Sequence, residues 1–189
     1  MALQFPLLLT QFFDQLTISE STFDLTESLE TNETGDGEYF TGDYGPRLWD
    51  GALTIRAETP DQADRLVARA ELLRSAGATF FVSRKHRIGP IADRNGTALG
   101  TATPVISALA TNNQEIDVSG LPPLYALREG DMLSFTYLSN PTRYALHRVI
   151  SDKTANATGN LYNLQLSPLI RPGAAINTGV TLIRPFCKA

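Results

Sequence analysis

Few side chains in this sequence could carry acid–base, nucleophilic or metal chemistry. The chain has two histidines, His86 and His147, and one cysteine, Cys187. Cations flank His86 and disfavour its protonation. His147 lies in an alternating segment typical of a strand, where a lone histidine is more often structural than catalytic. Two histidines and one cysteine cannot by themselves form an ordinary structural zinc site. We therefore predict no metal site and no cofactor.

The sequence motifs of the common enzyme classes are also missing. The sequence contains no G-x-S-x-G, no P-loop, no G-x-G-x-x-G and no H-E-x-x-H. Glycoside hydrolysis by a pair of carboxylates stays open as a hypothesis, because the chain has 20 acidic residues, but the sequence does not single out a pair. We predict that the protein is not an enzyme and that its role is structural.

Charge is distributed unevenly along the chain. The first 46 residues contain no Lys or Arg and nine acidic residues, namely Asp14, Glu20, Asp24, Glu27, Glu30, Glu33, Asp36, Glu38 and Asp43. The rest of the chain holds the other 11 acidic residues and all 16 basic ones. Such a split suits head-to-tail self-assembly, in which the acidic surface of one copy meets the basic surface of the next. A solvated acidic loop is the alternative.

The one basic run is Arg84, Lys85, His86 and Arg87. A sequence pI near 5.2 and the lack of any helix-turn-helix, zinc-finger or RNA-recognition pattern argue against sequence-specific nucleic-acid binding. We expect either a solvated turn or a salt-bridged contact between subunits. The sequence lacks a membrane-length apolar run, and its N-terminus lacks the features of a signal peptide. It predicts a soluble protein made in a cytoplasm, without membrane insertion.

Residues 31–45, TNETGDGEYFTGDYG, are rich in turn-forming residues. The segment is either a mobile loop, with aromatic side chains packed on their own domain, or an arm that carries those side chains to a partner. The spacing of its acidic residues is not that of an EF-hand calcium loop. The candidate assembly surface combines the aromatic residues of this segment with the basic run: Tyr39, Phe40, Tyr44, Arg84, Lys85 and Arg87.

One long helix is predicted over residues 59–77. Thr59 is a good N-cap, Pro60 suits the first helical position, and Gln62 completes a capping box. Gly77 is the expected stop. An apolar stripe that we expect to be buried consists of Ala63, Leu66, Val67, Ala70 and Leu73. The helix is long enough to cross several strands of a sheet.

The rest of the chain indicates strands and turns. Residues 1–30 alternate as extended segments, and residues 48–57 and 80–82 form a strand before and a strand after the helix. Further strands are expected over residues 115–118, 132–138, 144–151, 161–167 and 180–186. The fold class is therefore mainly β: a β-sandwich or split barrel with one flanking α-helix, about residues 60–76. Residues 1–189 form a single domain, or two lobes of residues 1–90 and 91–189.

The C-terminal 65 or so residues resemble the end of distal tail proteins, the tail-tip hub proteins of long-tailed, siphovirus-like bacteriophages. Five turn and strand-end features carry the resemblance. They are an L-x-x-G-D turn (Leu127, Gly130, Asp131), an H-x-V unit (His147 to Val149), an A-x-x-x-G turn (Ala155, Gly159), a P-L-I-R strand end (Pro168 to Arg171) and a last strand near Arg184 to Cys187.

The resemblance implies a structural virion protein of the tail tip, or baseplate. Such proteins form a hexameric ring that joins the tail tube to the host-recognition apparatus. The implied partners are other copies of this chain, the tail tube protein, and tail-tip hub or receptor-binding proteins, with DNA passing through the lumen. The implied location is the virion, after synthesis in the host cytoplasm. The resemblance brings no catalytic residues.

Two other functions stay open from the residues alone. One is a carbohydrate-binding or receptor-binding β-sandwich module of a baseplate, with Trp49, Tyr39, Phe40 or Tyr44 as stacking platforms. The other is a cell-wall hydrolase that uses carboxylates the sequence does not single out.

Overall fold

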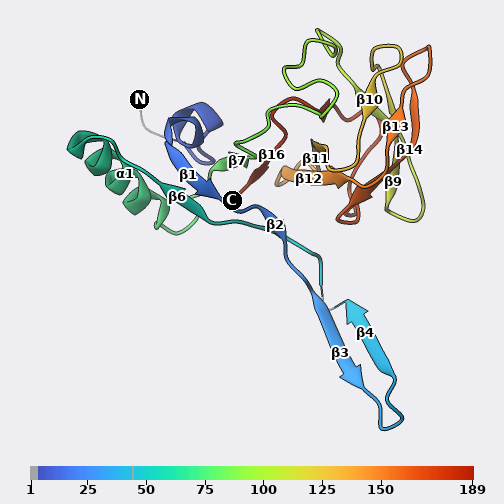
Figure 1. Cartoon of the computed structure of the whole chain (residues 1–189), viewed down its shortest axis with the longest axis horizontal. Coiled ribbons are helices and arrows are strands. Elements are labelled where there is room, and N and C mark those ends of the chain that lie inside the picture. The colour runs from blue at the N-terminus through green and yellow to red at the C-terminus, as the bar shows by residue number, and fades with distance from the viewer. Residues whose placement is uncertain (1–3, 44) are drawn as a thin grey trace.

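The computed structural model describes residues 4–43 and 45–189, and it is mainly β, with 35% of residues in strands and 11% in helices. Figure 1 shows three parts: a barrel-like body, an N-terminal lobe that holds the one α-helix, and a long two-stranded arm. The fold class predicted from the sequence is confirmed, since the main sheet is a nearly closed barrel accompanied by one helix.

The body is a six-stranded antiparallel sheet. Its strands lie in the order β15 (Val180–Thr181), β11 (Met132–Tyr137), β12 (Arg143–Val149), β14 (Leu161–Ser167), β9 (Glu115–Ser119) and β8 (Val105–Leu109). Backbone bonds between the two ends of this order almost close the barrel: Ile106 N–H donates to Thr178 O (2.9 Å) and Val180 N–H to Pro104 O (2.8 Å). A separate short pair joins β10 (Ala126–Leu127) to β13 (Lys153–Thr154).

Alternating apolar side chains fill the barrel. The fully buried members include Ile106, Ile116, Val118, Leu133, Val149, Leu161, Leu164 and Leu166. Burying each such side chain contributes roughly 1.5–3 kcal/mol to folding. The strands predicted over residues 115–118, 132–138, 144–151 and 161–167 correspond to β9, β11, β12 and β14. The segment predicted as one strand over 180–186 is instead two short strands, β15 and β16 (Phe186–Lys188).

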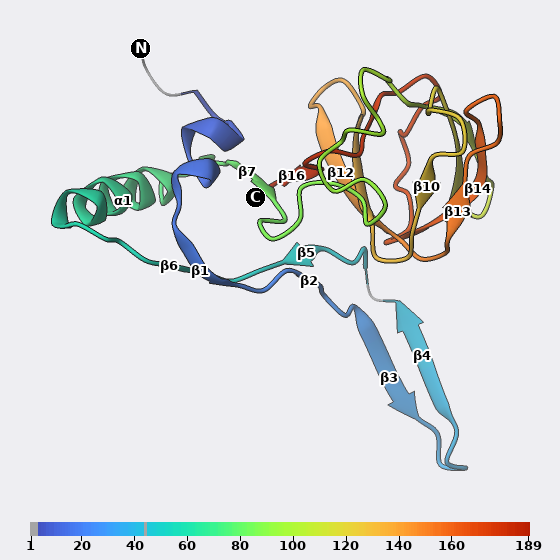
Figure 2. The same cartoon turned by 45° about the horizontal axis from the view of Figure 1, so that its top comes forward.

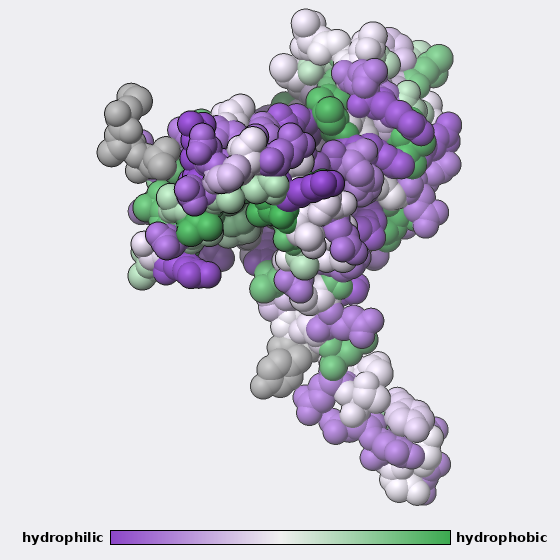
Figure 3. Space-filling model, turned by 60° about the vertical axis from the view of Figure 1, so that its left-hand side comes forward, coloured by the Kyte–Doolittle hydropathy of each residue, from purple (hydrophilic) through white to green (hydrophobic). Residues whose placement is uncertain are grey.

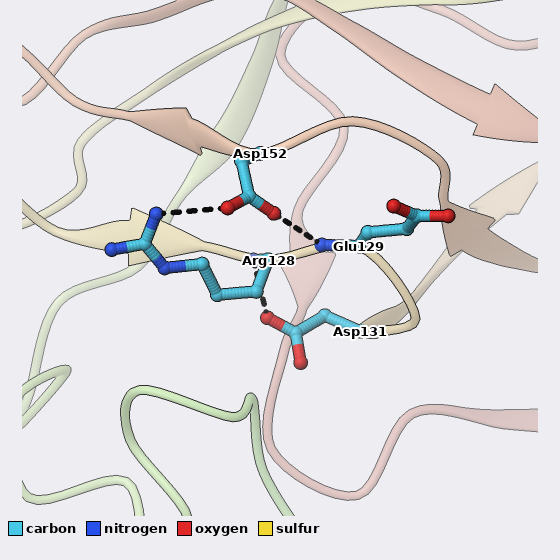
Figure 4. Close-up of polar contacts among 4 residues, drawn as sticks. All are labelled: Arg128, Glu129, Asp131 and Asp152. Carbon is cyan, nitrogen blue, oxygen red and sulfur yellow. Dashed lines mark hydrogen bonds and ion pairs between the residues drawn. The ribbon is translucent and has the colours of Figure 1, made fainter.

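The L-x-x-G-D turn before β11 is held by two carboxylates (Figure 4). Asp131 is fully buried, and its two oxygens accept hydrogen bonds from the backbone N–H groups of Ile91 and Arg128, both at 2.7 Å. Asp152 accepts from Glu129 N–H at 2.8 Å and pairs with the Arg128 guanidinium at 3.1 Å. Each carboxylate thus satisfies backbone donors that the turn would otherwise leave unpaired.

The N-terminal lobe has its own small core. Leu7, Phe12, Phe13 and Leu16 are buried together, with Leu66, Leu73 and Phe80 among the side chains packed against them. Two short 3-10 turns, Leu9–Gln11 and Phe13–Gln15, shape this segment, so the extended structure predicted for residues 1–30 is wrong here. The two cores lie on either side of residue 90 in the sequence.

The helix α1 (Pro60–Leu73) begins as predicted. The Thr59 side chain accepts from Gln62 N–H, and the Gln62 side chain accepts from Glu58 N–H. The helix ends at Leu73, before Gly77.

Although α1 is long enough to cross several strands of a sheet, it packs on the core of the N-terminal lobe, whose buried side chains come from residues 7–16. That short segment covers a narrow side of the helix. Leu66 and Leu73 contact the core, whereas Val67, another member of the predicted stripe, is 56% exposed. The strands before and after the helix are not neighbours, because β6 (Leu53–Ile55) pairs with β1 (Ile18–Ser21), and β7 (Phe81–Ser83) pairs with β16.

Residues 18–55, called here the arm, form one long antiparallel ribbon (Figure 2). The ribbon consists of β1 with β6, β2 (Asp24–Leu25) with β5 (Trp49–Asp50), and β3 (Leu29–Glu33) with β4 (Tyr39–Asp43). Two threonines continue the ladder between strands: Thr22 N–H donates to Ala52 O and Thr26 N–H to Leu48 O, while their hydroxyls accept from the same two residues' N–H groups. Residues 31–45, expected to be either a mobile loop or an arm, contain the end of β3, a turn and β4.

Candidate functional site

The outer end of the arm, residues 29–43, is called here the tip hairpin. It stands clear of the body (Figure 3), and every described residue of β3 is exposed. Three large apolar side chains on it are exposed as well: Leu29 by 59%, Tyr39 by 66% and Phe40 by 62%. In the register, Tyr39 pairs with Glu33 and Phe40 with Asn32, which places the two aromatic rings on opposite faces of the hairpin. The tip hairpin thus presents apolar groups on both sides.

The tip hairpin is also acidic. It contains Glu30, Glu33, Asp36, Glu38 and Asp43 and no Lys or Arg. Its turn is short and regular, with Thr34 N–H donating to Glu38 O and Gly37 N–H to Thr34 O, both at 2.9 Å. A two-stranded hairpin without a covered face is marginally stable by itself in water. A surface that combines exposed aromatics with like charges is therefore suited to contact with a basic, partly apolar partner.

Trp49 anchors the base of the arm to the body. Its indole N–H donates to the backbone carbonyl of Leu146 in β12 at 2.7 Å. Its ring stacks on Phe23, with centroids 5.0 Å apart and planes at 9°, and the Arg148 guanidinium lies 5.2 Å from the ring centroid. These contacts come from both strands of the arm and from the barrel, so they fix the direction in which the arm leaves the body.

Beside this anchor lies a groove, called here the base groove. It consists of two adjoining cavities of about 260 and 670 Å³ that share Arg47, Pro168, Leu169 and Arg171. Its walls come from residues 45–49, 144–147, 166–172 and 187–188, with Tyr137 and residues 113–114 completing them. Leu48 and Leu169 are 54% and 56% exposed there. The groove therefore offers apolar surface where the arm meets the body.

The described charged side chains in the base groove are all positive. They are Arg47, Arg171 and Lys188, and none of the described residues that line the two cavities is Asp or Glu. Among the side chains that the structure describes, the ion pairs are Arg128 with Asp152 and Arg184 with Asp14. The three groove cations have no ion pair with a described carboxylate. An acidic group entering the groove would meet cations whose charge is not already compensated by such a pair.

His147 forms part of the groove wall but is not exposed. Its side chain is 2% exposed, stacks on Phe135 and has Nδ1 at 2.8 Å from Pro168 O, an acceptor that requires the proton on Nδ1. Burial lowers the pKa of His147 to about 4, against a smaller rise from the Pro168 hydrogen bond and a further lowering by Arg171. Nearby Cys187 is half-buried, and burial raises its thiol pKa to about 11. Both groups are uncharged at neutral pH and are poorly suited to acid–base or thiolate chemistry.

The basic run lies at the junction of the lobe and the body. Arg84 donates to Gly130 O at 3.3 Å, and Lys85 Nζ lies 3.4 Å from Leu16 O and 5.4 Å from the Phe13 ring centroid. Burial lowers the pKa of Arg84, and Arg87 and Arg148 lower it further. Burial likewise lowers the pKa of His86, as do the neighbouring arginines. Arg84 and Lys85 thus hold the two parts of the chain together.

The residues proposed from the sequence as an assembly surface do not form one patch. Tyr39 and Phe40 lie together on the tip hairpin, Arg84, Lys85 and Arg87 follow β7 near the body, and Tyr44 lies outside the described residues. Sequence reasoning missed the base groove. Its cations, Arg47, Arg171 and Lys188, are far apart in the sequence, and no local pattern connects them.

Two further observations concern metals and membranes. In the part of the chain that the structure describes, no three His, Cys, Asp or Glu side chains gather closely enough to hold a metal ion. No helix among the described residues combines the length and the apolar character needed to cross a membrane.

Comparisons with known proteins do not identify a family for this chain. No protein-family model matches the chain, and no curated protein matches it. The features that bear on function are therefore the arm, the base groove and the turn and strand-end motifs of the C-terminal segment.

Proposed function

We propose that this chain is a structural subunit of the tail tip of a long-tailed bacteriophage. Six copies form a closed ring that joins the tail tube to the host-recognition apparatus. The single observation that carries the proposal is the arm, which projects an acidic hairpin with exposed Leu29, Tyr39 and Phe40 away from the body. The C-terminal turn and strand-end motifs support the same function by resemblance.

In this proposal the arm mediates the contact between neighbouring subunits. The tip hairpin gains little stability from its own chain, because no described residue of β3 is buried. Contact with another protein supplies the missing burial. When the arm of one copy contacts a different surface of the next, the contact is heterologous, and repetition closes a ring if the rotation between neighbours closes.

The ring performs mechanical and recognition tasks and no chemical reaction. It holds the end of the tail tube, presents a docking face to hub or receptor-binding proteins, and leaves a lumen for DNA. The proposal needs no cofactor and no sequence-specific contact with nucleic acid. It places the mature protein in the virion, after synthesis in the host cytoplasm.

The test compares the full chain with a variant that has a shortened arm. Thr34 N–H donates to Glu38 O, and in the same register Glu30 and Gly42 are also a hydrogen-bonded pair, so residues 31–41 can be replaced by Asn-Gly, a two-residue turn suited to a hairpin. Native mass spectrometry and negative-stain electron microscopy should show six-membered rings for the full chain and monomers for the variant. Thermal unfolding of the body should be the same in both. A full chain that stays monomeric at high concentration, with and without its tail tube protein, would contradict the proposal.

Carbohydrate binding is the second candidate, because two aromatic side chains at the tip are exposed. Trp49 is a poor stacking platform, since its ring already contacts Phe23 and Arg148. A glycan array with the full chain and with Tyr39→Ala and Phe40→Ala variants separates the two functions. Sugar binding that disappears in these variants would favour a receptor-binding module, whereas a ring subunit should bind no sugar through them.

A further inference from the structure

The arm and the base groove have opposite chemistry. The tip hairpin has five acidic residues and no basic one, whereas the described charged residues that line the groove, Arg47, Arg171 and Lys188, are all basic. Coulomb attraction between such surfaces guides encounter and selects register. It also disfavours contact between two arms or between two grooves, because like charges would then face each other.

The apolar surfaces match as well. The tip hairpin exposes Leu29, Tyr39 and Phe40, and the groove exposes Leu48 and Leu169 in its walls. The larger cavity of the groove, about 670 Å³, is spacious enough to receive aromatic side chains. Aromatic anchors in a pocket, surrounded by charged pairs at the rim, are the usual arrangement of a stable protein contact.

The arm cannot fill the groove of its own chain. The groove lies at the base of the arm, and the tip hairpin points away from the body (Figures 1 and 2). The contact at Trp49 and Leu146 fixes this direction at the base. The occupant must therefore come from another molecule, and a second copy of this chain supplies the complementary charge and aromatic groups.

A second basic groove is less suitable. It lies between α1 and residues 15–17 and is lined by Arg56, Arg65 and Arg69, with Leu66 as its large apolar side chain. Arg69 there already donates to Gln11 O at 2.6 Å and contacts the Gln15 side chain. Arg47 of the base groove is likewise engaged, donating to Thr26 O at 3.1 Å, so the difference lies in the apolar surface, which is smaller in the second groove.

We propose that the tip hairpin of one copy docks into the base groove of the next, with Phe40 against Leu48 and Leu169, Tyr39 on the outer face of the hairpin, and the tip carboxylates beside Arg171 and Lys188. The inference rests on the proposed ring assembly and adds to it the surface that receives the arm. Since each copy has one arm and one groove, the same contact repeats around the assembly.

Charge reversal tests this contact in the full chain. The tip variant Glu30→Lys/Glu33→Lys and the groove variant Arg171→Glu/Lys188→Glu should each weaken association by roughly tenfold or more in sedimentation velocity. A chain that combines the two pairs of substitutions should recover most of the association. Raising the salt concentration should weaken the wild-type contact, because exposed charges are screened.

Two matched controls change the same charge elsewhere. Asp64→Lys/Glu71→Lys alters exposed acids on α1, and Arg56→Glu/Arg65→Glu alters the second basic groove. Neither should change association by more than about twofold. If the second control weakens association as strongly as Arg171→Glu/Lys188→Glu, or if the combined chain shows no recovery, the assignment of the base groove is overturned.

Cross-linking keeps this inference separate from the ring. In a Cys187→Ser background, a chain with Asn32→Cys and Leu169→Cys should give a ladder of oligomers with a short bismaleimide, and a chain with Asn32→Cys and Arg65→Cys should not. Rings without the ladder would overturn the docking inference and leave the ring intact. A ladder without closed rings would support the docking and contradict the ring. If the experiments show no rings and no ladder, both the ring and the docking contact are contradicted.

Discussion

The indole N–H of Trp49 donates a 2.7 Å hydrogen bond to the backbone carbonyl of Leu146, 97 residues further along the chain. This bond joins the returning strand of the arm to the barrel strand β12, beside the stacked ring of Phe23. The direction of the arm therefore depends on one side chain that contacts both parts. The position of the base groove depends on the same contact, because Trp49 lines it.

Replacing Trp49 should loosen the arm more than the barrel. Trp49→Phe removes the donor and costs about 1 kcal/mol, and Trp49→Ala also removes the aromatic pair and costs about 3 kcal/mol. Hydrogen exchange should become faster in residues 45–55 and stay unchanged in β14. Because Trp49 is the only tryptophan, its fluorescence in the wild-type chain also reports this contact. Equal acceleration in both segments would mean that Trp49 supports the whole fold instead.

The two carboxylates of the L-x-x-G-D turn should differ in importance. Asp131→Asn leaves one oxygen for the two backbone donors at Ile91 and Arg128, so one buried N–H loses its partner, at a cost of about 1–3 kcal/mol. Asp152→Asn is the matched control, because the Asp152 side chain is 58% exposed and water can replace its contacts. Urea unfolding of both variants measures the difference. A larger loss of unfolding free energy for Asp152→Asn than for Asp131→Asn would contradict the greater importance of Asp131.

Stability should fall on mild acidification because of His147. Its pKa in the folded protein is about 4, lower than the ordinary 6.5, so the unfolded chain binds the proton first as the pH falls. The stabilisation is complete above pH 6.5 and decreases between pH 6.5 and 4, by about 3 kcal/mol in total.

The His147→Asn variant tests that pH dependence, because its amide can still donate to Pro168 O but does not titrate. Urea unfolding between pH 8 and 4 should show a flatter profile for the variant than for the wild type. The same slope in both proteins would mean that other groups cause the acid sensitivity.

Neighbouring residues of α1 should respond differently to truncation. Leu66 packs on the core of the N-terminal lobe, so Leu66→Ala should cost about 1–2 kcal/mol, less than a fully buried leucine. Val67 is 56% exposed, and Val67→Ala should be neutral or slightly stabilising, because alanine favours the helix. Limited proteolysis near residues 56–80 measures lobe stability. If the Val67→Ala variant folds normally but does not assemble, this side of the helix is an interface.

The elements that depend only on neighbouring residues could be predicted from the sequence. Thr59 and Gln62 mark the start of the helix because a cap needs only the first turn. In β14, Leu164 and Leu166 alternate with Gln165 and Ser167, because one face of that part of the strand is buried. The turn at Leu127 to Asp131 is likewise predicted by its glycine and aspartate. The mainly β fold class followed from these local patterns.

The arm and the base groove could not be predicted in this way, because both depend on contacts between segments that are distant in the sequence. Residues 31–45 have the composition of a loop. Their strands have no buried face, so the sequence shows no alternation of apolar and polar residues there. They pair as an extension of the ladder that Thr22 and Thr26 continue. The groove brings Arg47, Arg171 and Lys188 together across the folded chain. Hydrogen-bond registers and contacts between distant segments create both features, and residue types at local spacing do not contain that information.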